Sequence, residues 1–344
     1  MSVAVKLLTP PSAPAWDAFV RSRSDGTFFH LAAWRGVIET AFRHRTHYAF
    51  AERDGAITGV LPLAHVRTLL FGSTLVSVPF CVYGGPLSVD EESAAALEAH
   101  AAALLKQTHA AAVEFRFRDG AGGNQWVPRP ALYETFRKPI TADAERNMKA
   151  IPRKQRAMVR KGLQNGLIST VGHDVRRMHH VYAESVRNLG TPVFSRRYFE
   201  ILAATFRDSC DVVTVMEGET PIAAVLNFYY GEEVLPYYGG GSERARKSAG
   251  NDFMYWEVMR RAAERGCRLF DFGRSKIGTG AHAFKRNWGF EPTPLAYRYK
   301  LRPGTKMPDQ SPLNPKYRPF IAAWKRLPLP VAKAVGPYIV RGLG

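Results

Sequence analysis

Alternation of apolar and polar positions predicts two β-hairpins of the same construction. In the first, the segment 48–54 leads into a return strand at 55–66, and in the second, 212–218 leads into 219–230. Each pair of runs is rich in β-branched and aromatic residues and is separated by a charged, glycine-containing turn. The chain therefore carries the same element at two places.

Further elements follow each hairpin in the same order. Glycine-containing segments occur at 82–87 (VYGGPL) and 237–242 (YYGGGS), and closing strands are predicted at 111–117 and 267–273. Helical spacing lies between them in both halves, at Leu97, Ala101, Leu104 and Leu105 and at Tyr255, Val258, Met259 and Ala262. The order hairpin, strand, helix, strand, present twice, predicts a duplicated α+β unit.

The helix of the second half has expected end signals. Asn251 or Asp252 is expected to cap its start, and Gly266 is expected to end it. The boundary between the halves is expected near residues 138–150. This gives a first unit at 1–140, a second at 141–300 and a tail at 301–344.

Charge distinguishes two segments from the rest of the 344-residue chain, whose formal net charge is +18. The segment 146–161 has seven basic residues and no acid, and 301–344 has eight basic residues and one acid, Asp309. The remaining chain is near neutral. Positive charge concentrated in this way favours phosphates, which belong to nucleic acid, nucleotide-linked sugars or an anionic membrane.

Other composition signals point to a cytoplasmic protein. The three cysteines, Cys81, Cys210 and Cys267, are far apart and form no CxxC pair, which is typical of reduced thiols. The first residues are too short and too proline-broken for a signal peptide. No run of about 18 apolar residues predicts a membrane span.

The stretch 271–290 (DFGRSKIGTGAHAFKRNWGF) carries the strongest chemical signal. It fails the phosphate-loop pattern, since Thr279 stands where a lysine is needed, and it lacks the acid that a dinucleotide fingerprint requires. What remains is a basic, flexible loop at a strand end, whose Arg274, Lys276 and Lys285 suit a phosphate or a developing oxyanion. His282 is a less favoured general base. Trp288 and Phe290 are expected in the core rather than against a ligand.

No other catalytic or metal-binding pattern is present in the sequence. There is no HExxH, no GxSxG and no plausible set of metal ligands, so no metal is expected. The pair His44 and His47 has no acidic or cysteine partner nearby and is interpreted as surface.

Two basic segments each leave two interpretations open. Pro152 suits the first position of a helix on which Arg153, Arg156 and Arg160 share one face, either as a solvated surface or as a phosphate site. In the tail, helical spacing joins apolar residues beside a basic face: Tyr317, Phe320, Ile321 and Trp324. That amphipathic tail either packs on the protein body or lies in a membrane interface.

Three stretches of the sequence together resemble a known family. The segments 28–34 (FFHLAAW), 151–167 (IPRKQRAMVRKGLQNGL) and 266–290 (GCRLFDFGRSKIGTGAHAFKRNWGF) resemble the FemAB-like branch of the GNAT acyltransferase superfamily. The ending 324–344 is similar to the FemAB-like proteins associated with exosortase/PEP-CTERM systems. The resemblance covers nearly the whole chain. It implies an α+β fold of two tandem GNAT-like units, each a mixed central sheet flanked by helices.

The resemblance also implies an activity. Family members transfer an amino acid from aminoacyl-tRNA to an amine of a peptidoglycan precursor, and close relatives are thought to be acetyltransferases in exopolysaccharide synthesis. The family's Phe/Tyr-Lys pair matches Phe284 and Lys285. The stretch 246–251 departs from the acetyl-CoA-binding turn [RQ]-x-x-G-x-[GA], because Arg246 and Gly250 are one residue too far apart.

The sequence therefore predicts an acyl- or aminoacyltransferase that uses acyl-CoA or aminoacyl-tRNA and modifies a cell-envelope or exopolysaccharide precursor. Lys285 is the expected catalytic residue. The expected phosphate-binding residues are Arg274, Ser275, Lys276, Arg153, Arg156 and Arg160, and the expected acyl channel is Tyr238, Gly239, Gly240 and Asn251. Residues 316–341 are the expected contact with an anionic membrane, at the inner face of the plasma membrane. The alternatives are a non-catalytic GNAT-like module that docks exopolysaccharide machinery, and an RNA-binding protein.

Overall fold

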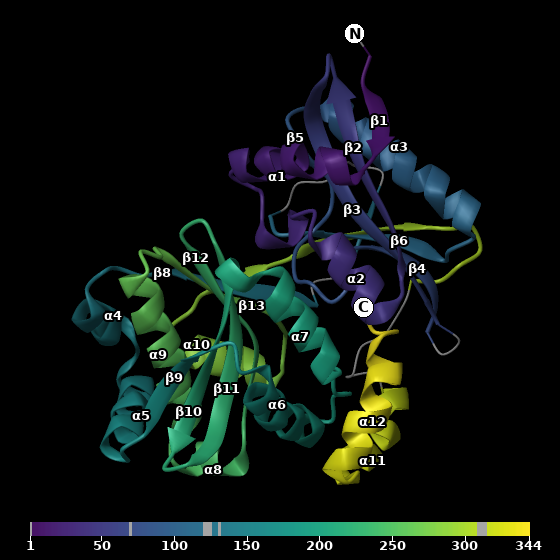
Figure 1. Cartoon of the computed structure of the whole chain (residues 1–344). Coiled ribbons are helices and arrows are strands. Elements are labelled where there is room, and N and C mark those ends of the chain that lie inside the picture. Colours follow the sequence, from purple (N-terminus) through teal and green to yellow (C-terminus); the bar gives the residue numbers. More distant parts are fainter. Residues whose placement is uncertain (1, 69–70, 120–125, 130–131, 308–314) are drawn as a thin grey trace. The chain divides into compact units, whose positions relative to one another are not determined.

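The computed structural model of the chain describes residues 2–68, 71–119, 126–129, 132–307 and 315–344. Its contacts divide the chain into two units (Figure 1). The first unit consists of residues 1–132, 294–314 and 338–344, and the second of 133–293 and 315–337. Each unit is built from segments that are distant in the sequence.

The first unit is a mixed sheet with strand order β1-β2-β3-β4-β6-β15-β7, on which β5 also pairs with β3. Its strands are β1 (Ala4–Leu7), β2 (Arg45–Arg53), β3 (Ala56–Thr68), β4 (Gly72–Ser77), β5 (Leu87–Ser88), β6 (Ala112–Phe117), β7 (Val127–Pro128) and β15 (Ala296–Leu301). Its α-helices are α1 (Ala13–Ser22), α2 (Trp34–Phe42) and α3 (Glu91–Thr108). The core is formed where α3 packs on the sheet, with Leu97, Ala101 and Phe115 fully buried.

The second unit is a mixed sheet with strand order β14-β8-β13-β12-β11-β10-β9. Its strands are β8 (Tyr133–Pro139), β9 (Ile168–Gly172), β10 (Cys210–Glu217), β11 (Thr220–Tyr230), β12 (Glu233–Gly241), β13 (Leu269–Lys276) and β14 (Pro292–Pro294). Its α-helices are α4 (Ala144–Ala150), α5 (Arg153–Gln164), α6 (Val175–Leu189), α7 (Arg196–Thr205), α8 (Glu243–Lys247), α9 (Gly250–Glu264), α10 (Gly280–Asn287), α11 (Arg318–Arg326) and most of α12 (Leu329–Val340). Helix α9 is central, and Trp288 and Phe290 are buried in the core as the sequence predicts.

Both sheets share one plan, which confirms the predicted duplication. Three antiparallel strands, β2-β3-β4 or β10-β11-β12, are followed by a helical connection and a parallel strand, β6 or β13. The matched glycine segments are nevertheless not equivalent. VYGGPL (82–87) follows β4, which ends at Ser77, whereas Tyr237–Gly241 forms the end of β12.

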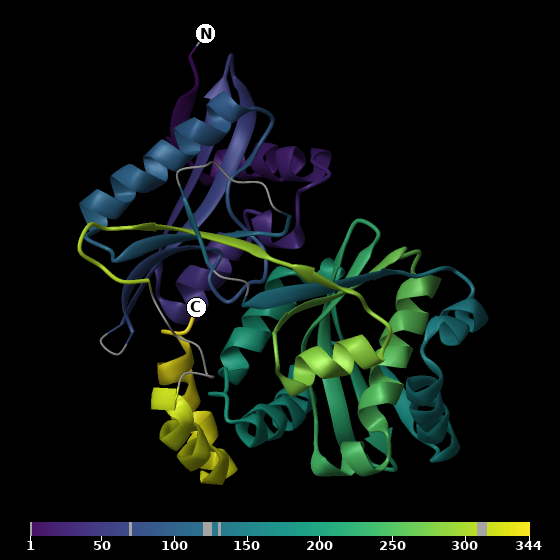
Figure 2. The same ribbon diagram turned by 180° about the vertical axis from the view of Figure 1, so that it is seen from behind.

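Each sheet also takes a strand from a distant part of the sequence. Strand β8 pairs antiparallel with β13 of the second unit, and β15, yellow-green in Figure 2, pairs antiparallel with β6 of the first. The structure therefore divides the chain differently from the linear boundaries expected at 140 and 300. The reason is strand pairing. One edge of β6 and one edge of β13 need a hydrogen-bonding partner, and in each case the partner strand comes from the other side of the expected boundary.

Two local expectations are corrected by the structure. Helix α9 begins after Ala249, which has no capping side chain, so neither Asn251 nor Asp252 caps it. Asp252 is instead buried and accepts hydrogen bonds from Gln155 Nε2 (2.7 Å) and Trp288 Nε1 (3.0 Å). His44 is not a surface residue, since it is buried and bonds Arg341 O through Nε2 at 2.7 Å.

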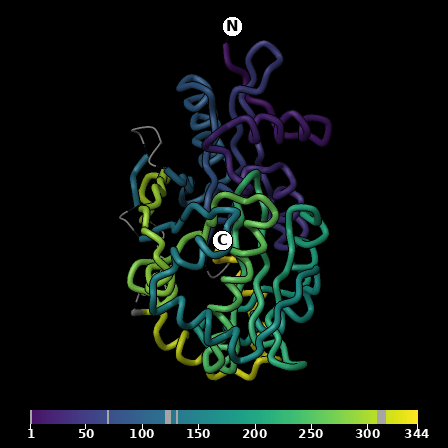
Figure 3. Tube along the Cα trace, turned by 90° about the vertical axis from the view of Figure 1, so that its left-hand side faces the viewer, coloured from purple at the N-terminus to yellow at the C-terminus, as the bar shows by residue number. Residues whose placement is uncertain are grey.

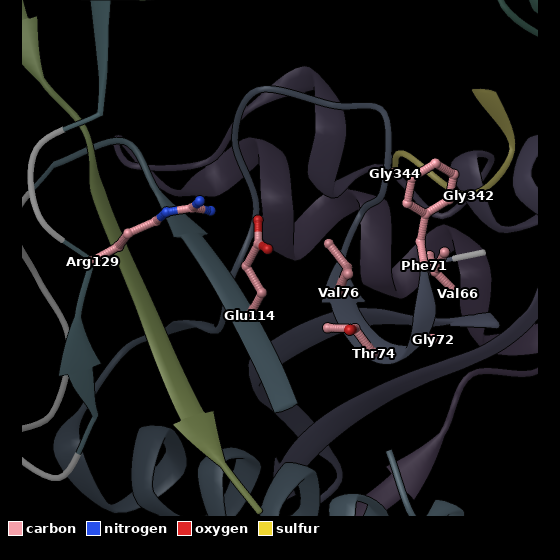
Figure 4. A pocket seen from close by; sticks show the side chains of 9 residues that line it. All are labelled: Val66, Phe71, Gly72, Thr74, Val76, Glu114, Arg129, Gly342 and Gly344. Atoms are coloured by element: carbon pink, nitrogen blue, oxygen red, sulfur yellow. The ribbon is translucent and has the colours of Figure 1, made fainter. Parts of the chain in front are cut away.

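Close to β4 and β6, the first unit contains a small cavity (Figure 4). Its volume is about 20 Å³, enough for about one water molecule. Glu114 and Arg129 lie toward one end of it and the C-terminal residues Gly342 and Gly344 toward the other. The end of the chain thus fills this face of the sheet, and the space left over excludes a substrate.

The tail, yellow in Figure 1 and Figure 3, forms the helices α11 and α12. Among the helices of the described ranges, none has the length and apolar character needed to cross a bilayer. The three cysteines are buried and free.

Candidate active site

The basic stretch of the second unit is a strand followed by a helix, not the flexible loop expected from its glycines. Strand β13 continues through Arg274, Ser275 and Lys276, which face Thr135, Glu134 and Tyr133 of β8 in register. Gly273 has a φ of 63°, and the register shifts between Asp271 and Arg274. The glycine therefore permits a bulge within the strand, and the chain then turns into α10.

Lys285 of α10 holds this bulge. Its Nζ donates to the carbonyl oxygens of Phe272 (2.6 Å), Gly273 (3.0 Å) and Arg274 (3.0 Å). These are the three donors that an ammonium group has. The predicted catalytic lysine thus points at the irregular part of β13. There it donates hydrogen bonds to carbonyl groups that the bulge removes from regular strand pairing.

The electrostatic surroundings make Lys285 titratable near neutral pH. Burial lowers its pKa to about 7, a shift that Asp271 opposes and that Arg274 increases. The buried Asp271 is itself engaged, since its Oδ1 accepts from Gly273 N (2.7 Å) and its Oδ2 lies 3.2 Å from Arg137 Nε. No carboxylate contacts Lys285 directly within the described part of the chain, so its charge is balanced mainly by backbone dipoles.

A histidine–carboxylate pair lies on the same helix. His282 Nε2 is 2.6 Å from Glu134 Oε2, and the His282 ring packs edge-on against Phe136 at 5.2 Å. Lys285 Nζ lies 5.4 Å from the centre of the same Phe136 ring. Both side chains therefore face β8 side by side. With Nε2 donating to Glu134, the Nδ1 of His282 keeps a free lone pair, and it has no hydrogen-bond partner among the described residues.

The two parallel strands part next to these groups. Strands β12 and β13 pair at Glu233–Leu269 and Val234–Phe270, and within the described residues the parallel pairing ends there. Tyr255 of α9 lies at this parting: its ring is 4.7 Å from that of Phe272. Its hydroxyl would be 3.2 Å from a Cβ added to Gly239, and it has no hydrogen-bond partner among residues that the structure describes.

The residues expected to form an acyl channel are largely occupied by packing. A Cβ on Gly240 would lie 2.5 Å from Ser185 Cβ, and one on Gly241 would lie 2.1 Å from Asn251 Oδ1. The Tyr238 hydroxyl is 2.8 Å from that of Tyr198, inside an aromatic cluster. The glycines of β12 thus let α6 and α9 approach the strand closely.

Of the three arginines expected on α5, Arg153 and Arg160 are exposed and Arg156 is half-buried. None of them has an ion-pair partner in the described ranges. The opposite face of α5 carries the buried Gln155, whose bond to Asp252 joins this helix to α9 and to Trp288 just beyond α10. The basic face is therefore fixed to the same framework as Lys285, without being brought into contact with it.

The helices that connect the two parallel strands of each sheet differ in charge between the units. In the first unit α3 begins at Asp90, Glu91 and Glu92, next to a cavity of about 740 Å³. That cavity is lined by carboxylates and one arginine among its charged groups: Asp25, Asp90, Glu91, Glu98, Asp119 and Arg118. In the second unit α8, before α9, carries Glu243, Arg244, Arg246 and Lys247, with Lys247 paired to Glu243 and Arg244 paired to Glu217. The excess of carboxylates makes the first arrangement the less suited of the two to phosphate groups.

The sequence did not single out Glu134 or Tyr255 as site residues, and it named Asp252 only as an expected helix cap. Glu134 lies in the part of the sequence that was assigned to the first unit. Tyr255 appears in the sequence only as one residue of an apolar helical stripe. No group of three or more His, Cys, Asp or Glu side chains suited to a metal occurs within the described residues.

Solved structures share this tandem arrangement. The crystal structure of FemX matches with a TM-score of 0.65 at 16% identity, covering 87% of this chain and 97% of that one. L-PGS from Bacillus licheniformis matches at 0.54 and 14%, covering 87% and 94%. A tandem GNAT protein from the clavulanic acid biosynthesis pathway matches at 0.53 and 12%, covering 87% and 98%.

At these identities the likeness shows the fold, which is two GNAT-like α+β units in tandem, as predicted. Residues 146–286 also match the family described as "Acetyltransferase (GNAT) domain". The matched residues cover most of the second unit, including β12, β13 and most of α10. No curated protein matches the chain in sequence.

Proposed function

We propose that this protein is an acyl- or aminoacyltransferase whose reaction takes place in the second unit. The observation that carries the proposal is the parting of β12 and β13 beside the bulge held by Lys285. Strands that part expose backbone groups able to bind an extended donor, and the charged groups of β13 and α10 lie beside it. The GNAT match over residues 146–286 supports the same location.

The donor is acyl-CoA or aminoacyl-tRNA, and both present an acyl carbonyl and phosphates. Lys285 stabilises the oxyanion by exchanging one of its carbonyl partners for the substrate oxygen. Arg274, Ser275 and Lys276 bind the phosphate near the reacting group. The acyl group of the donor lies along β12. It is lined there by the parts of Tyr238, Gly239, Gly240 and Asn251 that are not already taken up by packing between β12, α6 and α9.

Proton transfer is assigned to His282. The acceptor amine or hydroxyl attacks the acyl carbon, forming a C–N or C–O bond while the C–S bond of a thioester or the C–O bond of the aminoacyl ester breaks. His282 Nδ1 accepts the proton that the nucleophile loses and returns it to the departing sulfur or oxygen. Glu134 keeps Nε2 protonated and so holds the required tautomer.

The basic face of α5 binds the remote part of a substrate in this proposal. Arg153, Arg156 and Arg160 contact tRNA phosphates or a pyrophosphate-linked sugar. The acceptor is a cell-envelope or exopolysaccharide precursor, in keeping with the resemblance to proteins of exosortase/PEP-CTERM systems. The protein would then work in the cytoplasm, at the inner face of the plasma membrane.

One observation favours a second function, a non-catalytic module that docks exopolysaccharide machinery. All three Lys285 donors are already used by backbone carbonyls. A lysine with only this role would stabilise β13 and perform no chemistry. Transfer remains the first proposal because a purely structural role gives no reason for the His282–Glu134 pair beside it.

Donor binding tests the proposal. Purified protein is titrated with acetyl-CoA and, separately, with bulk aminoacyl-tRNA at two salt concentrations. Saturable acetyl-CoA binding that is lost in Arg274→Ala indicates a CoA-dependent enzyme. Salt-sensitive tRNA binding that weakens in Arg153→Glu/Arg160→Glu indicates aminoacyl transfer. Binding of neither donor would contradict the transferase proposal and favour the docking module.

A further inference from the structure

The tail helices are fixed to the second unit by one set of apolar residues. Trp324 is buried and donates through Nε1 to Thr191 O at 2.9 Å. Ile321 fills the space above Gly190, and Gly336 of α12 packs against Val193. The tail is therefore an ordered part of the fold, and this set of contacts satisfies the expectation that it packs on the protein body.

A second set of apolar side chains on the same helices is left uncovered. Phe320 is 45% exposed on α11, and Val331 and Val335 are 41% and 42% exposed on α12. Tyr338, which is 77% exposed, continues the stripe of Val331 and Val335 at i, i+4 and i+7 along α12. The two interpretations of the tail are thus not alternatives, because separate residues meet the body and the solvent.

Charge decides what covers this surface. Residues 315–344 contain six basic residues, Lys316, Arg318, Lys325, Arg326, Lys333 and Arg341, and no acidic one. Lys325 and Arg326 are exposed on the last turn of α11, and neither has an ion-pair partner in the described ranges. Exposed apolar side chains next to uncompensated cations suit an anionic lipid surface, since each contributes to interfacial binding.

The length of α12 excludes insertion across a bilayer. Its 12 residues span roughly 18 Å, against about 30 Å for the hydrocarbon core. A helix of this length lies along the interface, with aliphatic and aromatic side chains below the phosphates and cations level with them.

We propose that α11 and α12 form a docking surface for an anionic bilayer, with Phe320, Val331, Val335 and Tyr338 entering the interface and Lys325 and Arg326 meeting lipid phosphates. A second copy of this chain is a poorer occupant, since it would bring like charges together. RNA is also poorer, because it offers nothing to cover aliphatic side chains. The proposal does not depend on the transferase activity.

Vesicle flotation of the full chain tests it. The probes are vesicles of phosphatidylcholine alone and vesicles with about a third phosphatidylglycerol, because anionic headgroups are the predicted partner. Wild-type protein is expected to float only with the anionic vesicles, and less so at high salt. Val331→Asp/Val335→Asp is expected to weaken binding about tenfold or more, and Lys325→Glu/Arg326→Glu by a similar factor.

Matched variants on α5 separate this surface from general basicity. Arg153→Glu/Arg160→Glu makes the same charge change as Lys325→Glu/Arg326→Glu, and Leu163→Asp places an acid at a side chain that is 49% exposed. Both are expected to float as wild type does. Light scattering on each variant detects self-association. Equal flotation of Val331→Asp/Val335→Asp, equal loss in the α5 variants, or dissociation of a dimer with unchanged flotation would each overturn the proposal.

Discussion

Each unit places a cation next to the strand that follows its helical connection, β6 in the first unit and β13 in the second, but the cations differ in kind. In the first unit Arg116 of β6 donates to Glu114 (2.7 Å) and to Cys81 O (2.8 Å). In the second, Lys285 donates to three carbonyls near the β13 bulge and to no carboxylate in the described residues. One cation is permanently charged and paired, and the other has a pKa near 7.

This difference indicates what each unit can do. The Arg116–Glu114 pair is closed, since Glu114 Oε2 also accepts from Tyr299 at 2.6 Å. Such a pair stabilises one geometry and offers no group to a substrate. Lys285 has a lowered pKa, and its hydrogen-bond acceptors are backbone carbonyls. His282 lies beside it. Under the proposed function, the first unit keeps a structural pair at Arg116 and Glu114, and the reaction takes place in the second unit beside Lys285.

The largest expected effect is a loss of stability from a substitution in the first unit. Arg116→Met leaves Glu114 buried without its cation, and breaking a buried pair costs about 3–5 kcal/mol. Chemical denaturation is the measurement. Arg244→Ala is the control, because Arg244 pairs with Glu217 at an exposed position and should cost less than about 1 kcal/mol. A small effect of Arg116→Met would show that this pair is not what holds β6.

Lys285→Ala is expected to lower the transfer activity proposed for the second unit. If Lys285 stabilises an oxyanion, transfer should fall about 10²–10³-fold in protein that remains folded. Turnover and denaturation are measured on the same sample. A change within about twofold in turnover, together with lower stability, would make Lys285 the counterpart of Arg116 and remove the contrast between the units.

His282→Gln should lower turnover by about 10²-fold, the usual contribution of a positioned base. Glu134→Gln removes only the group that fixes the tautomer, so its loss of turnover should be smaller. ¹⁵N NMR of the His282 ring reports the tautomer without any substrate. Protonation at Nδ1 instead of Nε2 in wild-type protein would contradict the assigned role.

Gly240→Ala distinguishes packing from an acyl channel. The added Cβ would meet Ser185 Cβ at 2.5 Å, so overpacking should destabilise the protein by about 1–3 kcal/mol. Gly280→Ala is the matched control, since nothing lies within 4 Å of the Cβ it would add. Unchanged stability with reduced turnover in Gly240→Ala would restore the channel interpretation.

A further expected effect is a pH dependence of stability. The folded-state pKa of Lys285 is about 7, below its ordinary value of 10.5. Between these pH values the unfolded chain binds the extra proton, so the contribution of Lys285 to stability rises with pH across this window and is constant below it. Lys285→Met should flatten this part of the profile, as measured by denaturation from pH 7 to pH 10. An unchanged slope would assign the ordinary pKa to Lys285.

The repeat, the hairpins and the fold were predictable, because hydrophobic periodicity and turn residues are local signals. The placement of Arg274, Ser275 and Lys276 was not, because glycines that permit a strand bulge look the same in sequence as glycines of a loop. Glu134 was missed for a different reason. Its strand pairs with β13 across more than a hundred residues, and no local pattern marks such an exchange.

Hydrogen exchange with and without donor tests most directly whether the second unit is the reactive one. The protein is exchanged alone, with saturating acetyl-CoA and with aminoacyl-tRNA. One donor is expected to protect amides of 233–241 and 269–276, while those of 72–77 and 112–117 stay unchanged. Protection of the first unit's strands, or of neither pair, would contradict the division of roles between the two units.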